Sequence, residues 1–113
     1  MNRDESVYLR HILDAVVRID TYPIDVSEDN FRQNTLLQDG VIRQIEIIGE
    51  ATKRLTSDLR GRYHQIPWED IAGMRDKLIL DYFGVDIEKV WLTATEDIPV
   101  LKREIAQILT ALS

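Results

Sequence analysis

Apolar residues recur at spacings of three and four along most of this chain, the repeat of an α-helix that buries one face. The first such segment covers about residues 5–20. The second, about residues 34–56, has an apolar stripe wide enough to meet neighbours on more than one side. That width predicts a central helix, or one that also forms a dimer seam. Later helices are expected over about residues 67–83, 86–94 and 101–112.

Several residues mark where these helices begin and end. Pro23 ends the first helix, because the residue before a proline avoids the helical conformation. Ser27 stands before two acidic residues like an N-cap, and predicts a short helix through residues 31–33. Residues 57–65 have the composition of a polar link with room for one helical turn. Pro67 suits the first turn of the helix that follows.

The last third of the chain has similar boundary signals. Gly84 is expected to end one helix in the left-handed conformation, and Asp86 to cap the next. Pro99 is expected to interrupt the pattern before the last helix. No alternating strand pattern of useful length occurs. The sequence therefore predicts an all-α fold, a bundle of four or five helices running up and down.

Composition limits the classes of function. A length of 113 residues with 44% apolar residues predicts one packed domain over residues 1–113. The absence of cysteine excludes disulfides and thiolate metal sites, and favours the reducing cytoplasm. No apolar run approaches the roughly 18 residues of a membrane span, and the polar first residues do not resemble a signal peptide. We therefore expect a cytoplasmic protein with no membrane contact.

The charge balance disfavours broad nucleic-acid binding. Fourteen basic residues face twenty acidic ones, which gives a formal charge of −6. Phosphate attraction needs an excess of lysine and arginine, so any RNA contact must be local or built at a dimer interface.

Few residues suggest catalysis or metal binding by their spacing. His11 and His64 have no metal-ligand neighbours at suitable spacing, and each is expected to be structural or on the surface. The acidic pairs lie near predicted helix starts, where they oppose the helix dipole: Glu28-Asp29, Glu69-Asp70 and Glu96-Asp97. The glycines are isolated, so no phosphate-binding loop is present. We expect no metal and no cofactor.

One stretch gathers polar chemistry at the end of an apolar helix, from Met74 to Gly84. Its polar residues are Arg75, Asp76, Lys77, Asp81 and Tyr82. Arg75 and Tyr82 are seven residues apart and would share one helix face. By composition alone, a solvated helix end with a half-buried tyrosine is the favoured explanation of the stretch.

The region from Pro67 to Trp91 resembles the HepT-like toxins of the HEPN superfamily. Their motif is R-x4-H-x-Y with a polar residue after the arginine, and Arg75, Asp76 and Tyr82 occupy three of these positions. The resemblance extends to Gln38–Ala51, to Phe83-Gly84-Val85-Asp86 and to Val90-Trp91, so it covers nearly the whole chain. It implies a HEPN-like bundle and a toxin that is a metal-independent endoribonuclease.

This chain departs from the motif at one position, because Leu80 stands where the family has histidine. In the family the arginine and histidine are the catalytic pair. Attack by the ribose 2′-OH needs proton transfer, which histidine supplies near neutral pH, and a cation such as Arg75 for the developing phosphorane charge. Leucine transfers no proton, and losing a general acid–base costs about 10²–10⁴ in rate. The chain as written is therefore expected to be inactive, through an inactivating substitution or as a natural pseudoenzyme.

The resemblance also implies a homodimer. Arg75 and position 80 are five residues apart, or about 140° around an ideal helix, so they converge only if the helix distorts or two chains share the site. In a dimer, Arg75 and Lys77 from both chains would form a local phosphate-binding patch, with Asp76 orienting Arg75 or a base.

The family is partnered by an MntA-type nucleotidyltransferase antitoxin, which transfers AMP from ATP to the motif tyrosine. The resemblance thus implies that Tyr82 is an AMP acceptor, and that hetero-oligomers with the antitoxin form. Two other functions stay open. One is a non-catalytic helical dimer module that binds the nucleotidyltransferase, and the other is a helical domain that binds a nucleotide and stimulates its partner enzyme.

Overall fold

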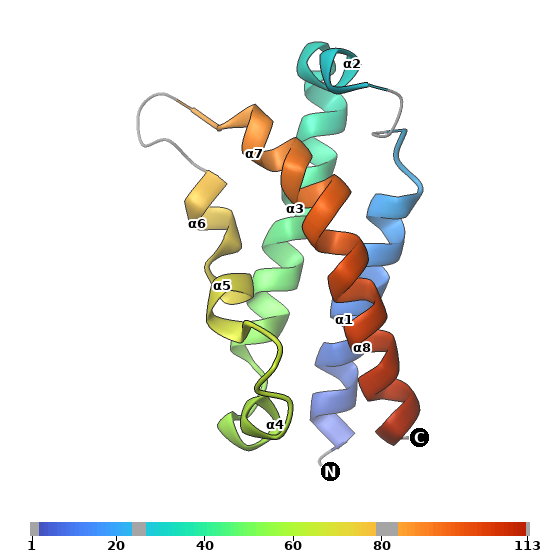
Figure 1. Ribbon diagram of the computed structural model, residues 1–113, viewed down its shortest axis with the longest axis vertical. Helices are drawn as coiled ribbons and strands as arrows, with labels where there is room; N and C mark the ends of the chain where they lie inside the picture. The colour runs from blue at the N-terminus through green and yellow to red at the C-terminus, as the bar shows by residue number, and fades with distance from the viewer. Residues whose placement is uncertain (1–2, 24–26, 79–83, 113) are drawn as a thin grey trace.

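The structure is a computed structural model and describes residues 3–23, 27–78 and 84–112. All regular elements in these ranges are helical, which confirms the predicted all-α class (Figure 1). They are α1 (Arg3–Asp20), α2 (Glu28–Gln33), α3 (Thr35–Lys53), α4 (Ser57–Arg62), α5 (Trp68–Ala72), α6 (Met74–Leu78), α7 (Ile87–Leu92), a π-helical turn (Thr93–Asp97) and α8 (Ile98–Leu112). No helix among the described residues is long and apolar enough to cross a membrane.

The three long helices α1, α3 and α8 form the body of the bundle, and α1 packs against both of the others (Figure 1). Their buried stripes meet in one core, which includes Leu9, Ile12, Val16, Val41, Ile45, Ile48, Ile98 and Ile105. Lys102 of α8 also pairs with Asp20 at the end of α1. α3 contacts α2, α5, α6 and α7 besides α1, which confirms the prediction of a central helix.

Side-chain caps fix the turn from α2 into α3. The Ser27 hydroxyl accepts a hydrogen bond from the Asn30 N–H at 3.0 Å, which confirms the predicted N-cap. The Asn34 side-chain oxygen accepts from the Leu37 N–H at 3.0 Å and begins α3 in the same way. The buried Gln38 amide then donates to the carbonyls of Phe31 and Arg32 at 2.8 and 2.9 Å. These bonds satisfy backbone groups that a helix end otherwise leaves without partners.

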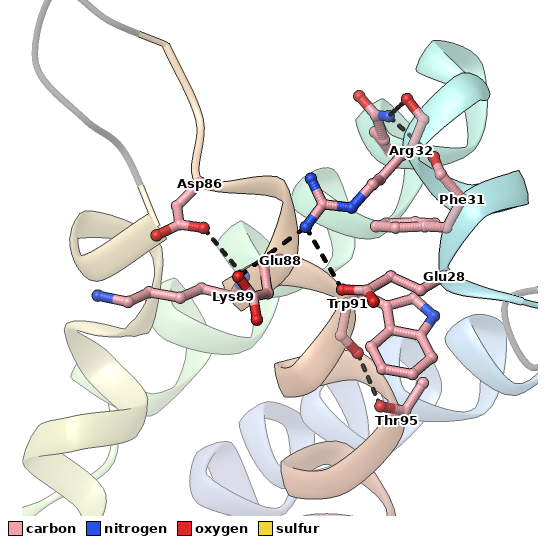
Figure 2. Close-up of polar contacts among 9 residues, drawn as sticks. Glu28, Phe31, Arg32, Asp86, Glu88, Lys89, Trp91 and Thr95 are labelled. Atoms are coloured by element: carbon pink, nitrogen blue, oxygen red, sulfur yellow. Dashed lines mark hydrogen bonds and ion pairs between the residues drawn. The ribbon is translucent and has the colours of Figure 1, made fainter.

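Ion pairs join α2 to α7, as Figure 2 shows. The Arg32 guanidinium lies 3.5 Å from the Glu28 carboxylate on its own helix and 3.9 Å from that of Glu88. The Asp86 carboxylate accepts from the Lys89 N–H at 3.2 Å, which confirms the predicted cap of α7. Arg32 and Glu88 are exposed to water and Glu28 is partly exposed, so these ion pairs add little to the stability of the fold.

The prediction of a single helix over residues 67–83 is wrong, because the helix is interrupted at Gly73, which separates α5 from α6. α5 lies so close to α3 that a Cβ on the buried Gly49 would stand 3.1 Å from the Ala72 carbonyl oxygen. Because the helix is interrupted at Gly73, the contact of α5 with Gly49 does not fix the axis of α6. Pro67 is the residue before α5 and not part of its first turn. Gly84 has the expected positive φ, +91°.

Residues 57–65 hold more structure than a link. α4 spans Ser57–Arg62 and buries Leu59 in the core. The Thr56 hydroxyl caps it by accepting from the Leu59 N–H at 3.1 Å. The buried Glu5 carboxylate of α1 accepts a hydrogen bond from the Thr56 N–H at 2.8 Å, and so connects the start of α4 to α1.

Pro99 does not interrupt the last helical segment, contrary to expectation. The π turn directly before it widens the helix, and the Ile98 N–H bonds to the Thr93 carbonyl five residues back. Proline lacks an N–H and clashes with the carbonyl four residues earlier in a regular helix, so a locally widened turn accommodates it. The chain therefore continues from α7 through the π turn into α8.

Candidate functional site

Arg75 is held on α6 by two carboxylates. Its Nε lies 3.4 Å from Glu46 Oε1 of α3, and its Nη1 lies 3.7 Å from Asp76 Oδ1. Half of the Arg75 side chain is exposed. These three residues line a hollow of about 170 Å³ between α3 and the α5–α6 segment. An arginine held through Nε keeps N–H groups on its two terminal nitrogens, which can meet a phosphate in bidentate fashion.

Glu46 was not singled out by the sequence, although it contacts the predicted site. Its second oxygen lies 3.8 Å from Arg43 Nη1, so one carboxylate stands between two arginines. The spacing of Arg43 and Glu46 signals only an ordinary helix pair. The contact with Arg75 depends on how α6 packs against α3, and no local pattern encodes that packing.

Lys77 does not share the Arg75 hollow. Two residues correspond to about 200° around a helix, so the two cations point to different sides of α6. The Lys77 Nζ lies 3.1 Å from Asp70 Oδ1. It lines a larger hollow of about 650 Å³ between α5–α6 and the α7–α8 segment, whose lining is mainly apolar and includes Met74, Leu92 and Val100. Arg75 and Lys77, both predicted phosphate contacts, thus lie in different hollows.

Leu80 and Tyr82 lie outside the described residues, as does Asp81. The residues on either side of this stretch are close together, because the Asp86 N–H donates to the Leu78 carbonyl at 2.8 Å. Leu78 is buried and ends α6, the helix that carries Arg75.

The two histidines and the acidic pairs have ordinary positions. His11 and His64 are exposed. Among the described residues no group of three potential metal ligands lies together. Glu28-Asp29 and Glu69-Asp70 lie in the first turns of α2 and α5, as predicted. Glu96-Asp97 lies instead in the π turn, inside a continuous helical segment.

A third hollow of about 430 Å³ lies between α1 and α3. Tyr8 and His11 of α1 line it, with ring centroids 6.1 Å apart in an edge-to-face arrangement. The Arg54 guanidinium carbon lies 5.9 Å from the Tyr8 ring centroid, within cation–π range. Glu46 and Glu50 line both this hollow and the one beside Arg75, so the two hollows adjoin along α3.

Comparison with known proteins shows the family to which the chain is similar. A family model described as "Ribonuclease HepT-like" matches residues 12–108. A Methanocaldococcus jannaschii protein, named as a gamma-glutamylcyclotransferase joined to a candidate RNase, is 48% identical over 99% of this chain, and the chain spans half of that relative. The Thermococcus cleftensis protein "Probable ribonuclease HepT" is 42% identical over 90% of this chain and 93% of its own length. No solved structure matches.

Proposed function

Because this chain belongs to the HepT-like ribonuclease family, we propose that Arg75 marks the active site of a metal-independent endoribonuclease, the toxin of a HepT/MntA-type toxin–antitoxin pair. The observation that carries this proposal is the setting of Arg75. It lies in the family-matched region, half exposed in a hollow, with Nε beside Glu46. A cation in such a place is ready to bind a phosphate that enters from solution.

Arg75 would stabilise the reaction by charge. When the ribose 2′-OH attacks the neighbouring phosphorus, negative charge grows on the phosphorane oxygens, and two guanidinium N–H groups can donate to it. Glu46 and Asp76 hold the arginine, and they also lower its net attraction for RNA. A homodimer, in which two Arg75 side chains face one cleft, would offset those carboxylates.

Leu80 is the reason for the second part of the proposal, that this chain is an inactive form. The attack requires a base for the 2′-OH proton and an acid for the departing 5′ oxygen. Leucine supplies neither, and neither histidine in the described residues lines the Arg75 hollow. The substitution of the motif histidine therefore removes proton transfer while leaving phosphate binding by Arg75 in place.

The decisive experiment restores the histidine. We expect Leu80→His to cleave RNA in the presence of EDTA at a rate about 10²–10⁴-fold higher than that of the unaltered chain. Induction of Leu80→His should also arrest growth. A matched control is Leu36→His, which adds a histidine at a leucine that is 84% exposed on α3. Leu36→His should leave RNA intact.

If Leu80→His and Leu36→His are equally inert, the ribonuclease proposal fails. The alternative function is then a non-catalytic helical dimer module that binds a nucleotidyltransferase. It predicts complex formation with an MntA-type partner that is independent of the residue at position 80. Co-purification and light scattering measure that complex directly.

We also propose that Tyr82 accepts AMP from such a partner. The phenol oxygen forms a bond to the α-phosphorus of ATP, the α–β phosphoanhydride bond breaks, pyrophosphate leaves, and the phenol proton passes to a base. The added phosphate would compete with RNA for Arg75. Mass spectrometry after incubation with the partner and ATP should show added AMP on this chain and none on Tyr82→Phe. An equal addition to both would exclude Tyr82 as the acceptor.

A further inference from the structure

We propose that the hollow between α1 and α3 binds the stretch of single-stranded RNA next to the phosphate at Arg75, with Tyr8 and His11 contacting a base and Arg43 and Arg54 contacting phosphates. The inference rests on the proposed function, because it extends the strand held at Arg75. It assigns RNA contacts to a part of the molecule that the motif does not include.

The charge of the hollows favours RNA on this side of the molecule. The described residues that line the α1–α3 hollow and the Arg75 hollow include four cations, Arg43, Lys53, Arg54 and Arg75, and three carboxylates, Glu46, Glu50 and Asp76. The protein as a whole has a formal charge of −6. The larger hollow beside Lys77 has two lysines against four carboxylates, Asp70, Glu96, Asp97 and Glu104. A polyanion is therefore drawn to the α1–α3 side and repelled from the larger hollow.

The carboxylates on this side are already paired. Glu46 lies beside Arg43 and Arg75, and Glu50 lies 3.4 Å from Lys53. Arg54 has no carboxylate partner among the described ion pairs and contacts the Tyr8 ring instead. Its guanidinium is thus the cation on this surface whose charge is least compensated, which makes it the first choice for a phosphate.

Tyr8 and His11 add what a single-stranded chain recognises besides charge. Tyr8 is partly buried, with Arg54 over its ring and the exposed His11 edge-on beside it. The part of these two rings that stays uncovered offers aromatic surface for a base, and stacking on such residues tolerates any sequence. Arg43 lies on α3 and Arg54 is the C-cap of the same helix, eleven residues on, which corresponds to a rise of roughly 16 Å. The two arginines can therefore contact different phosphates of one RNA strand. Glu46, which lies between them in the sequence, holds Arg75 near a further phosphate of that strand.

The test measures binding and not cleavage, so it uses the chain with Leu80 as it stands. Fluorescence anisotropy with a labelled single-stranded oligoribonucleotide gives the affinity at several salt concentrations. Affinity falls as salt rises, so the slope of log affinity against log salt is negative. We expect the double variant Arg43→Ala/Arg54→Ala to make this slope shallower by about 1.4, since each lost phosphate contact removes about 0.7. Tyr8→Leu should weaken binding about 5- to 150-fold, whereas Tyr8→Phe, which keeps the ring, should not.

Arg18→Ala is the matched control, because Arg18 is an exposed arginine of α1 outside the hollow. If the double variant binds RNA with the affinity and salt slope of Arg18→Ala, the inference is overturned. It is also overturned if the unaltered chain binds no RNA, or if the double variant changes only the oligomeric state, which would make this face an interface between copies. Cleavage of RNA by Leu80→His tests the proposed function separately. If Leu80→His cleaves RNA while Arg43→Ala/Arg54→Ala binds RNA as tightly as the unaltered chain, only this inference is overturned.

Discussion

The two segments that meet at Arg75 are built very differently. α3 is one helix of 19 residues with apolar side chains buried along its length, and it packs against most of the other helices. The α5–α6 segment is two helices of five residues separated by Gly73. Only Trp68, Ile71 and Leu78 are buried in it. Glu46 stands on the first segment and Arg75 on the second.

This difference separates stability from function. Helices shorter than about 12 residues are marginal in isolation, so α6 keeps its shape through contacts with α3 and not through its own propensity. α3 carries the core, and α6 presents a charge to solvent from a lightly packed position. Changes in α3 should therefore lower the free energy of unfolding, while changes in α6 should alter activity with little effect on stability.

The largest expected effect is on the α3 side of the comparison. Ile45 is completely buried, and Ile45→Ala should lower the free energy of unfolding by about 2–5 kcal/mol through lost burial and the cavity left behind. Urea denaturation followed by circular dichroism measures the change. Leu36→Ala, on the exposed side of the same helix, is the control and should change it by less than about 0.5 kcal/mol. A small change in the free energy of unfolding for Ile45→Ala would mean that the buried face of α3 contributes little to the stability of the core.

On the α6 side the expected effect is on rate. In a chain that also carries Leu80→His, Arg75→Ala should lower RNA cleavage about 10²–10³-fold, the cost of removing one donor to a developing anion. The free energy of unfolding should change by less than about 1 kcal/mol, because the ion pairs of Arg75 are exposed. A large loss of stability would show that Arg75 is structural and would remove the contrast between the two segments.

A third change probes the contact between the segments. Gly49→Ala places a methyl group 3.1 Å from the Ala72 carbonyl, so α5 must shift or α3 must bend. We expect the free energy of unfolding to fall by about 1–3 kcal/mol through overpacking. Gly61→Ala in α4 meets no atom within 4 Å and should raise it by about 0.5–1 kcal/mol through helix propensity. Equal effects at both glycines would show that the close approach is unimportant.

The smallest expected effect tests whether α3 orients Arg75. Glu46→Gln, in the Leu80→His background, should change the free energy of unfolding by less than about 1 kcal/mol. It should lower kcat for RNA cleavage more than it raises KM, because it loosens the arginine without removing it. Asp39→Asn, at an exposed carboxylate of the same helix that lines neither the Arg75 hollow nor the α1–α3 hollow, is the control and should leave kcat unchanged. The idea fails if both variants behave alike.

Much of the fold was predictable because its signals are local. The apolar stripes predicted α1 and α3 to within a few residues. Ser27 and Asp86 marked the starts of α2 and α7 by side-chain chemistry that needs no distant partner. The break at Gly73 was not predictable in this way. It accompanies the close approach of α5 to Gly49, a residue more than twenty positions away.

The same distinction applies to the site. Arg75 and Asp76 were predicted from the motif, and their roles stay predictions, while the ion pair between them follows from adjacency in the chain. Glu46 was missed because only the packing of α6 on α3 brings it to Arg75. Lys77 was grouped with Arg75 from sequence proximity, and the helix turn sends it to another hollow. Leu80 and Tyr82 lie outside the described residues, so their roles stay predictions.

The π turn has a consequence for how chains of this kind can change length. Val90, Ala94 and Ile98 are buried at two successive spacings of four, which on a regular helix would rotate the apolar stripe by about 80°. The wider turn absorbs that rotation and keeps one face toward the core up to Ile108. Removing one exposed residue here, such as Glu96, and replacing Pro99 as well would restore a spacing of three and a regular helix, because a regular helix has no room for the proline ring. A one-residue gap in an alignment is therefore cheapest at this turn, where it leaves the buried face intact.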